Sequence, residues 1–383
     1  MDMFVVGTRF PQPRQERLEL LASLEQLWGF RNDPIAFNLK LRELNVGITA
    51  AAKERGEYKK LPLEVHFYKY KYLTYSQWLY ALSFLLVAIL WLRPENKLLH
   101  GMTIALFSVP TALLIIGMVL RCIVRGRPPV STLYETILFI TAIVALCALF
   151  MEIVNRRRIA LSAGAFLGVA GMFLAFRYEA KEGVDTMPAL IAVLDTNFWL
   201  ATHVTTVVAG YAAGLFAAAI SHVYIFGKLF RLKEDDADFY ESMTRMSYGI
   251  ICFGLLFATV GTILGGVWAN DSWGRFWGWD PKENGALMIV LWMLIVLHAR
   301  LAEYIRDLGL HVMAVTLGMV VAFSWWGVNN LGVGLHSYGF IEGVWRNLTL
   351  FWLFESFVVL LALVLWYQNR QKSPDIAACD KKS

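Results

Sequence analysis

Long apolar segments recur along most of this chain. From Tyr75 onward the sequence repeatedly supplies runs of leucine, alanine, valine, glycine and phenylalanine with few charged residues. About 20 such residues are enough to cross a bilayer as an α-helix. Because apolar side chains also make up 57% of the 383 residues, we expect a polytopic membrane protein. The nine predicted spans cover residues 75–92, 98–120, 133–153, 158–176, 197–227, 246–268, 285–305, 310–328 and 347–367.

The apolar segments predict helices and not strands. They lack the alternation of apolar and polar residues that the strands of a membrane barrel show. The expected fold class is therefore an all-α polytopic membrane protein with eight to nine transmembrane helices. Residues 1–74 differ, because they combine mixed charge with apolar residues at helical spacing, and they predict amphipathic helices outside the lipid. The predicted organisation is an extramembrane segment at 1–74, a first span at 75–92, a membrane domain at 98–368 and a tail at 369–383.

Cysteine and charge content exclude several functional classes. The four cysteines form no CxxC pair, so neither a thiol-disulfide activity nor a zinc site is indicated. The net charge of +5 is modest, and the basic residues gather in small groups at the ends of spans. That distribution is typical of membrane topology and does not indicate nucleic-acid binding.

Basic residues in the short loops predict which face each loop occupies. Fifteen lysines and arginines lie in one set of loops and the tail, whereas the alternate loops hold eight. Because cytoplasmic loops carry the excess of positive charge, residues 273–283 are expected on the outer face and the tail 369–383 in the cytoplasm. Residues 1–74 then lie outside, although residues 1–6 are too short for the apolar core of a secretory signal. Two alternatives stay open: the span 75–92 lies along the interface or inserts late, or the reading frame begins where an upstream partner chain ends.

The loop at residues 273–283 is unusually rich in aromatic residues, with the sequence WGRFWGWDPKE. Phe276 and Trp277 follow Trp273 by three and four residues, so in a helical turn their rings would share one face. Such an aromatic platform suits a large, flat ligand that is partly apolar and partly anionic. Tryptophans line the interface of most membrane proteins, but three within seven residues exceed an interfacial belt. Asp280 and Glu283 fit helix capping as well as they fit a functional role.

The seven histidines separate into two layers. His203 lies about 9 Å below the outer end of its span, and His336 lies in the outer loop 329–343. Two neutral imidazoles on the side of the aromatic loop are what axial ligation of haem iron requires. His298 lies roughly 21 Å down its span, in the inner half of the membrane. The remaining histidines lie near cytoplasmic ends or in the N-terminal segment, and for three of them a structural or interfacial role is preferred: His66, His222 and His311.

These residues resemble a known family. The segment 273–283, followed by Trp292 and His298, resembles the tryptophan-rich WWD signature of haem-handling proteins. Three further blocks are similar to elements of the CcsA (ResC) family of system II cytochrome c maturation proteins, in the family's order over residues 98–368. They are RPPVSTLYE at 127–135, FWLATHV at 198–204 and GLHSYG at 334–339. Residues 63–70 and the span 75–92 resemble the junction at which some lineages fuse the partner CcsB (ResB) to CcsA.

The resemblance implies a function in cytochrome c maturation. Such a protein conveys haem b, its substrate and transient ligand, to the outer face and presents it for thioether attachment to a CxxCH apocytochrome c. The chain would be the haem-presenting subunit of a holocytochrome c synthase with a separately encoded CcsB-like partner, and thiol-reducing proteins would act indirectly. It would lie in the bacterial cytoplasmic (inner) membrane, or in the thylakoid membrane of a plastid.

The resemblance also implies roles for individual residues. His203 and His336 would ligate the haem iron at the outer site, and the loop residues would hold the macrocycle: Trp273, Phe276, Trp277, Trp279 and Asp280. His298 would belong to an inner haem site whose second ligand comes from the partner. His100 lies at a similar depth and is a weaker candidate, because it matches no motif. Propionates could pair with Arg125, Arg127 or Arg275, on the grounds of charge and side alone.

Three other functions are weighed against this one. A haem exporter or chaperone of the system I type, without synthase activity, would share the tryptophan-rich loop, and only the blocks at 129–135 and 203–204 favour CcsA. A bis-histidine electron-transfer cytochrome would place paired histidines at matched depth on facing spans, whereas the outer pair is divided between a span and a loop. A transporter of another amphipathic molecule would show discontinuous helices or a repeat.

Overall fold

The computed structural model describes residues 15–56, 58–182, 187, 196–336 and 343–379. Within these ranges the chain forms helices and no strand. It divides into two compact units, residues 1–70 and residues 71–383. Residues 1–6 and 337–339, considered in the sequence as a signal segment and as part of the third family block, lie outside the described ranges.

The first unit contains three helices, which are α1 (Gln15–Gly29), α2 (Pro34–Glu54) and α3 (Leu61–Tyr70). Helix α2 begins at Pro34 because the Asp33 carboxylate accepts hydrogen bonds from the next two free backbone N–H groups, at 3.0 and 3.1 Å. Helices α1 and α2 pack together, and Leu27 and Ala52 are buried. The sequence predicted amphipathic helices for this segment.

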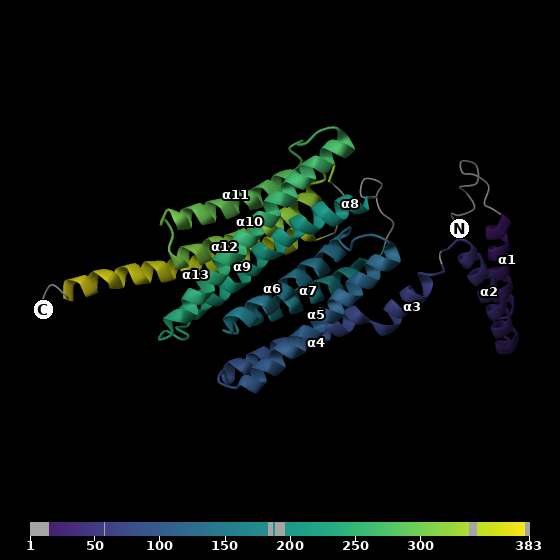
Figure 1. The fold of residues 1–383 in the computed structure, drawn as a ribbon, viewed down its shortest axis with the longest axis horizontal. Helices are drawn as coiled ribbons and strands as arrows, with labels where there is room; N and C mark the ends of the chain where they lie inside the picture. Colours follow the sequence, from purple (N-terminus) through teal and green to yellow (C-terminus); the bar gives the residue numbers. More distant parts are fainter. Residues whose placement is uncertain (1–14, 57, 183–186, 188–195, 337–342, 380–383) are drawn as a thin grey trace. The chain divides into compact units, whose positions relative to one another are not determined.

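The second unit is a helical bundle (Figure 1). Its first helices are α4 (Tyr72–Leu92), α5 (Lys97–Arg125), α6 (Leu133–Asn155) and α7 (Ile159–Glu182). The chain continues through α8 (Asn197–Trp199), the π-helical turn η2 (Leu200–Val204), α9 (Thr205–Leu229), α10 (Ala237–Trp273) and α11 (Pro281–Leu301). It ends with α12 (Asp307–Ala322), the π-helical turn η3 (Phe323–Gly327), the 3-10 turn η4 (Val328–Leu331) and α13 (Val344–Cys379).

Nine helical stretches in the described part of the chain are long and apolar enough to cross a membrane. They are Leu61–Leu92, Lys97–Arg125, Leu133–Asn155, Ile159–Ala180, Asn197–Leu229, Ala237–Trp273, Pro281–Leu301, Asp307–Leu331 and Val344–Gln371. Each overlaps one of the spans predicted from the sequence. The expected all-α polytopic membrane class is therefore confirmed.

Helix α10 extends well beyond its predicted span of 246–268. Its 37 residues reach about 55 Å at 1.5 Å per residue, whereas the hydrocarbon core is about 30 Å thick. The extra turns begin at Asp236, whose side chain caps the helix by accepting a hydrogen bond from the Phe239 backbone N–H. At the other end the helix carries Trp273 in its last turn. The aromatic loop therefore starts at the end of a long, continuous helix.

Helix α9 forms the centre of the bundle. It packs against α6, α7, α10, α12 and α13, and it runs alongside α10 and α12 in Figure 1. Small residues allow the close approach of α9 and α10: a Cβ atom on Gly210 would lie 2.9 Å from Ala258, and one on Gly261 would lie 2.6 Å from the Val207 backbone. This contact brings the N-terminal end of α9 against the last turns of α10.

Candidate functional site

A cavity of about 330 Å³ lies at the end of the bundle that carries the aromatic loop. Its walls come from η2 and α9, the last turns of α10, the aromatic loop, the start of α11, the segment 127–136 and the turns η3 and η4. Both His203 and His336 line it, together with Trp268, Trp273 and Trp277. Its size is in the range of small-molecule sites. The fold thus gathers two histidines and several tryptophans, far apart in the sequence, around one space.

His203 is held against the backbone of α10. It lies in η2, where the backbone makes one wider turn before α9 begins. Its Nδ1 lies 2.7 Å from the Gly261 carbonyl oxygen, so the ring donates from Nδ1. A Cβ atom on Gly265 would lie 2.6 Å from the ring, so glycine is needed there for the imidazole to fit. Because Nδ1 carries the proton, Nε2 keeps the lone pair that can bind a metal.

His336 is held against a carboxylate. Its Nδ1 lies 3.2 Å from Oδ1 of Asp280, and its ring meets the Trp273 ring edge to face with centroids 5.3 Å apart. Burial lowers the pKa of His336 although the Asp280 charge opposes this, so the ring is neutral near pH 7. Burial would raise the pKa of Asp280, but backbone hydrogen bonds, first that from Lys282, and the His336 ring bring it below its ordinary value.

The two histidines share one arrangement. In each, Nδ1 faces an acceptor oxygen, a backbone carbonyl for His203 and a carboxylate for His336. No hydrogen bond from a described residue engages Nε2 of either ring. Metal-ligating histidines are oriented in this way, with the nitrogen that does not bind the metal held by a carbonyl or a carboxylate. The donor set and the aromatic walls therefore fit haem iron with its porphyrin.

The aromatic loop is not the helical platform expected from its spacing. Helix α10 ends at Trp273, because Gly274 follows in the left-handed conformation with φ +69°. Trp277 lines the cavity, whereas Phe276 packs on Gly266, whose added Cβ would lie 2.5 Å from the Phe276 ring. Trp279 is 72% exposed and is not among the residues that line the cavity. The rings therefore do not share the face of one helix, although Trp273 and Trp277 both line the cavity.

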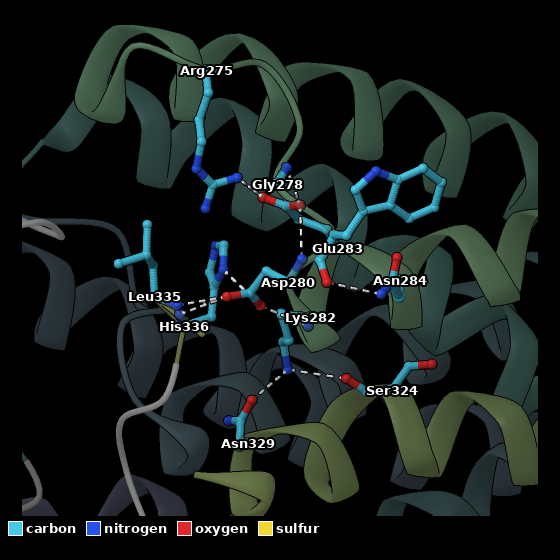
Figure 2. A network of polar contacts seen from close by, with 11 residues as sticks. Arg275, Gly278, Asp280, Lys282, Glu283, Asn284, Ser324, Asn329, Leu335 and His336 are labelled. Carbon is cyan, nitrogen blue, oxygen red and sulfur yellow. Dashed lines mark hydrogen bonds and ion pairs between the residues drawn. The ribbon is translucent and has the colours of Figure 1, made fainter. Parts of the chain in front are cut away.

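The Asp-Pro-Lys-Glu segment forms a polar network at the start of α11 (Figure 2). Asp280 and Glu283 form a capping box, in which Asp280 accepts a hydrogen bond from the Lys282 N–H and Glu283 accepts one from the Asp280 N–H. Glu283 also accepts from the Gly278 N–H at 2.8 Å and contacts Arg275 at 3.4 Å. The capping role considered from the sequence is confirmed. The same carboxylates also close the aromatic loop onto the helix.

Lys282 makes a set of contacts that the sequence did not reveal. Its ammonium group donates to the carbonyl oxygens of Ser324 and Trp325, at 3.1 and 2.9 Å, and to Oδ1 of Asn329, at 3.0 Å. These acceptors lie in η3 and η4, which follow α12. A cation here satisfies carbonyls at the end of a helix and complements its dipole. Lys282 therefore joins α11 to the chain that leads to His336.

Other cavity residues were only partly foreseen. Arg127 lines the cavity and is 7% exposed, whereas Arg125 and Arg275 are not among the lining residues. Sequence reasoning missed Tyr178, Tyr211 and Trp325. The adjacent tryptophans at 325–326 could have indicated a cavity residue. Single tyrosines within apolar spans give no such indication, because most of them pack in the core.

His298 and His100 lie away from this cavity. His298 is exposed on α11, and its Nδ1 lies 2.7 Å from the Leu294 carbonyl oxygen. His100, on α5, lies 2.8 Å from Oε1 of the buried Glu152. Figure 1 shows α5 and α11 on opposite flanks of the second unit. The chain therefore does not bring these two histidines to one site.

Two histidines near the same end of the bundle have structural partners. His311 is buried, hydrogen-bonds to Oγ of Ser221 at 2.8 Å and stacks on Tyr224. His222 lies 3.0 Å from Oε2 of Glu355. These contacts agree with the structural role preferred for both residues.

Comparison with known proteins identifies the family. A family model described as cytochrome C assembly protein matches residues 130–336, which is more than half of the chain. The chain belongs to this cytochrome C assembly protein family. The match ends at His336 and contains His203 and the aromatic loop, so the cavity lies almost entirely within the family's shared region.

Three relatives support the same membership. Cytochrome c biogenesis protein CcsA of Chlamydomonas reinhardtii is 33% identical over 249 residues, covering 62% of this chain and 68% of the relative. The protein of that name in Synechococcus sp. (strain CC9902) is 31% identical over 266 residues, covering 62% and 87%. The one in Fagopyrum esculentum subsp. ancestrale is 28% identical over 285 residues, covering 64% and 86%. The predicted CcsA resemblance is therefore confirmed, and it assigns the chain to cytochrome c maturation.

Substitution of Gly265 tests how the orientation of the His203 ring affects the cavity. If His203 ligates haem, Gly265→Ala should lower the haem content of the purified protein about tenfold, the order seen when the orientation of a metal ligand is disturbed, because the new Cβ would lie 2.6 Å from the His203 ring. Gly249→Ala is the matched control on the same helix, since a Cβ there meets nothing within 4 Å. Haem is measured per protein by its absorbance. Equal haem content in the two variants would contradict the expectation.

Proposed function

We propose that this chain binds haem between His203 and His336 and presents it for covalent attachment to an apocytochrome c. One observation carries the proposal: two histidines on separate segments line one aromatic cavity, with Nδ1 of His203 hydrogen-bonded to the Gly261 carbonyl and Nδ1 of His336 lying 3.2 Å from the Asp280 carboxylate. That arrangement leaves two neutral Nε2 atoms for an iron atom. Haem is the cargo of the site and not a resident cofactor.

The walls of the cavity suit the porphyrin. Trp268, Trp273 and Trp277 supply flat apolar surface for the macrocycle. Arg127 supplies a guanidinium group on the same wall, which can pair with a propionate. Of the three arginines considered from the sequence, Arg127 is the one that lines the cavity, so we assign the propionate contact to it. The proposed contacts thus match a ligand that is apolar across its face and anionic at its edge.

Attachment requires little chemistry from the protein. Each thiol of the CxxCH motif adds its S–H across a vinyl double bond, forming a C–S bond and a C–H bond, so no atom or electron is left over. The residues around the cavity hold the haem in place while the thiols approach, and such positioning can lower a barrier by several kcal/mol. His336 and His203 hold the iron until the histidine of the CxxCH motif replaces one of them.

Delivery would begin from the opposite side of the membrane. His298 lies on α11, the helix that starts at the Asp-Pro-Lys-Glu segment and ends at the other end of the bundle. We propose that it contributes one ligand to an inner haem site, with the second ligand from a CcsB-like partner. Supporting this, His298 is exposed on the flank of the bundle and open to a partner helix. His100 is engaged by Glu152 and is the weaker candidate.

The proposed orientation rests on the charge of the loops. The excess of basic residues in the alternate loops supports placing the cavity on the extracytoplasmic face. The membrane would be the bacterial cytoplasmic membrane or the thylakoid membrane, since relatives come from cyanobacteria and from a green alga and a plant. A bis-histidine electron-transfer cytochrome fits less well, because its ligands would face each other across two spans, whereas His336 lies in a loop.

Co-expression tests this function. The full chain is produced with a CcsB-like protein and a CxxCH apocytochrome c, purified in detergent and examined by absorption spectroscopy. We expect bound haem with the spectrum of bis-imidazole ligation, together with a covalent holocytochrome. Purified protein without haem, in cells that make haem, would refute the proposal. Haem without any holocytochrome would instead favour a haem exporter or chaperone of the system I type.

His298 has a separate expected effect. We expect His298→Ala to reduce total haem content and holocytochrome yield severalfold, while the haem that remains keeps its bis-imidazole spectrum, because the cavity ligands are intact. His66→Ala is the control, since His66 is an exposed histidine of α3. A changed spectrum in His298→Ala would contradict the assignment to a separate site.

A further inference from the structure

We propose that Asp280 is a positioning residue that holds His336 as a haem ligand and does not itself contact haem. This inference rests on the proposed function. The acid that closes the aromatic loop is buried, with 4% of its surface exposed. It is not among the residues that line the cavity, although its neighbours Lys282 and Glu283 are. Asp280 therefore reaches the cavity through His336.

Asp280 contacts the His336 segment at three points. Its Oδ2 accepts hydrogen bonds from the backbone N–H groups of Leu335, at 2.6 Å, and His336, at 3.3 Å. Its Oδ1 lies 3.2 Å from Nδ1 of His336. Figure 2 shows the carboxylate between the start of α11 and the chain at 335–336. One side chain thus fixes both the backbone and the ring of the ligand residue.

The loop is shaped to bring that carboxylate close. Gly334 has φ +86°, and a Cβ atom there would lie 2.1 Å from Oδ2 of Asp280. Only glycine combines this conformation with this approach. The close contact between the loop and Asp280 therefore depends on Gly334 in the loop as well as on the carboxylate.

The segment 280–283 also binds the turns η3 and η4, which precede His336 in the chain. Lys282 binds η3 and η4 through Ser324, Trp325 and Asn329, and Asp280 binds the chain at 335–336. Asp280 is the N-cap of α11 and Lys282 lies in its first turn, and Glu283 fixes this start through the capping box. The segment that carries His336 is thereby fastened to a rigid helix end at two places. The charged part of the motif orients the ligand, while Trp273 and Trp277 line the cavity that would hold the haem.

A carboxylate on Nδ1 also affects the ligand's chemistry. It fixes the proton on Nδ1 and raises the basicity of Nε2. A more basic ligand favours ferric iron, so loss of the carboxylate should move the reduction potential of the haem to more positive values. Asp280→Asn keeps an oxygen that can cap α11 in the place of Oδ1, but it removes the charge beside His336 and replaces Oδ2, the acceptor of the Leu335 and His336 N–H groups, with a donor.

Chemical rescue tests the inference. In the full chain with its partner, His336→Gly leaves space for free imidazole, which should restore the bis-imidazole spectrum. We expect Asp280→Asn in that background to raise the half-saturating imidazole concentration about tenfold or more. When Asp280→Asn is combined with His203→Gly instead, the half-saturating imidazole concentration should stay unchanged within twofold. Equal imidazole requirements in the two His336→Gly proteins would overturn the proposal.

The potential gives a second measurement that does not need rescue. With both histidines present, Asp280→Asn should shift the midpoint potential of the bound haem to more positive values, whereas Asp236→Asn should not. Asp236 is the control because its carboxylate also caps a helix, α10, by accepting a hydrogen bond from the Phe239 N–H. An unchanged potential in Asp280→Asn would also overturn the proposal. If neither histidine variant alters the haem spectrum, the proposed function fails instead, and the two failures are distinguishable.

Discussion

Replacing His336 or His203 with alanine is expected to lower holocytochrome c yield more than about 100-fold, because partners that merely orient a metal ligand are already worth 10- to 100-fold. Each substitution removes one of two Nε2 atoms at the cavity and leaves its walls intact. The residual haem should lose its bis-imidazole spectrum. The measurement is the yield of covalent haem in the co-expressed cytochrome, with the spectrum of the purified complex beside it.

The fold should survive both substitutions. Alanine removes one hydrogen bond at His203 and one contact with the Asp280 carboxylate at His336, and both side chains border a cavity and not a packed core. Protein level and thermal unfolding in detergent should therefore match His66→Ala, the exposed control. A variant with the yield and spectrum of the wild type would show that the replaced histidine does not ligate haem.

Replacing Lys282 with methionine is expected to lower the free energy of unfolding by about 2 to 3 kcal/mol, since it removes hydrogen bonds from a charged donor and leaves carbonyls unpaired. Methionine keeps most of the side-chain volume but no donor for Ser324, Trp325 and Asn329. The turns η3 and η4 lead to His336, so haem content should fall as well. Denaturation in mixed detergent micelles measures the first effect, and haem absorbance per protein the second.

The matched control is Lys97→Met. Lys97 is an exposed lysine at the first position of α5, and exposed substitutions usually change stability by about 0.5 kcal/mol or less. If Lys282→Met unfolds like Lys97→Met, the contacts across α11 and η3 do not stabilise the bundle.

The sequence predicted the helical class well because membrane spans follow a simple rule. Lipid forces each spanning backbone to satisfy its hydrogen bonds internally, so a long uncharged run such as residues 98–120 has one available structure. All nine predicted spans overlap helical stretches within the described residues. Helix ends were less predictable, because α10 extends past the lipid through residues whose composition carries no hydropathy signal.

The aromatic loop shows where spacing misled. The three- and four-residue intervals indicated one helical face, but Gly274 ends α10 after Trp273, so Phe276 packs on Gly266 while Trp273 and Trp277 line the cavity. Trp277 lines the cavity, whereas Trp279 is exposed. Residue type identified the loop as the important segment, yet the local backbone decided which ring faces the cavity.

From its sequence alone, this chain could be assigned to an all-helical membrane fold and to the CcsA family, with His203 and His336 as candidate ligands. Those conclusions depend on local composition and on short motifs, which the linear sequence displays. Only the tertiary structure showed that the two histidines share one cavity, that Nδ1 of His203 and of His336 lie beside oxygens of Gly261 and Asp280, and that Lys282 binds η3 and η4. These contacts join residues about 50 or more positions apart, or 43 for Lys282 and Trp325, and non-local pairing follows from packing between helices and not from periodicity along one of them.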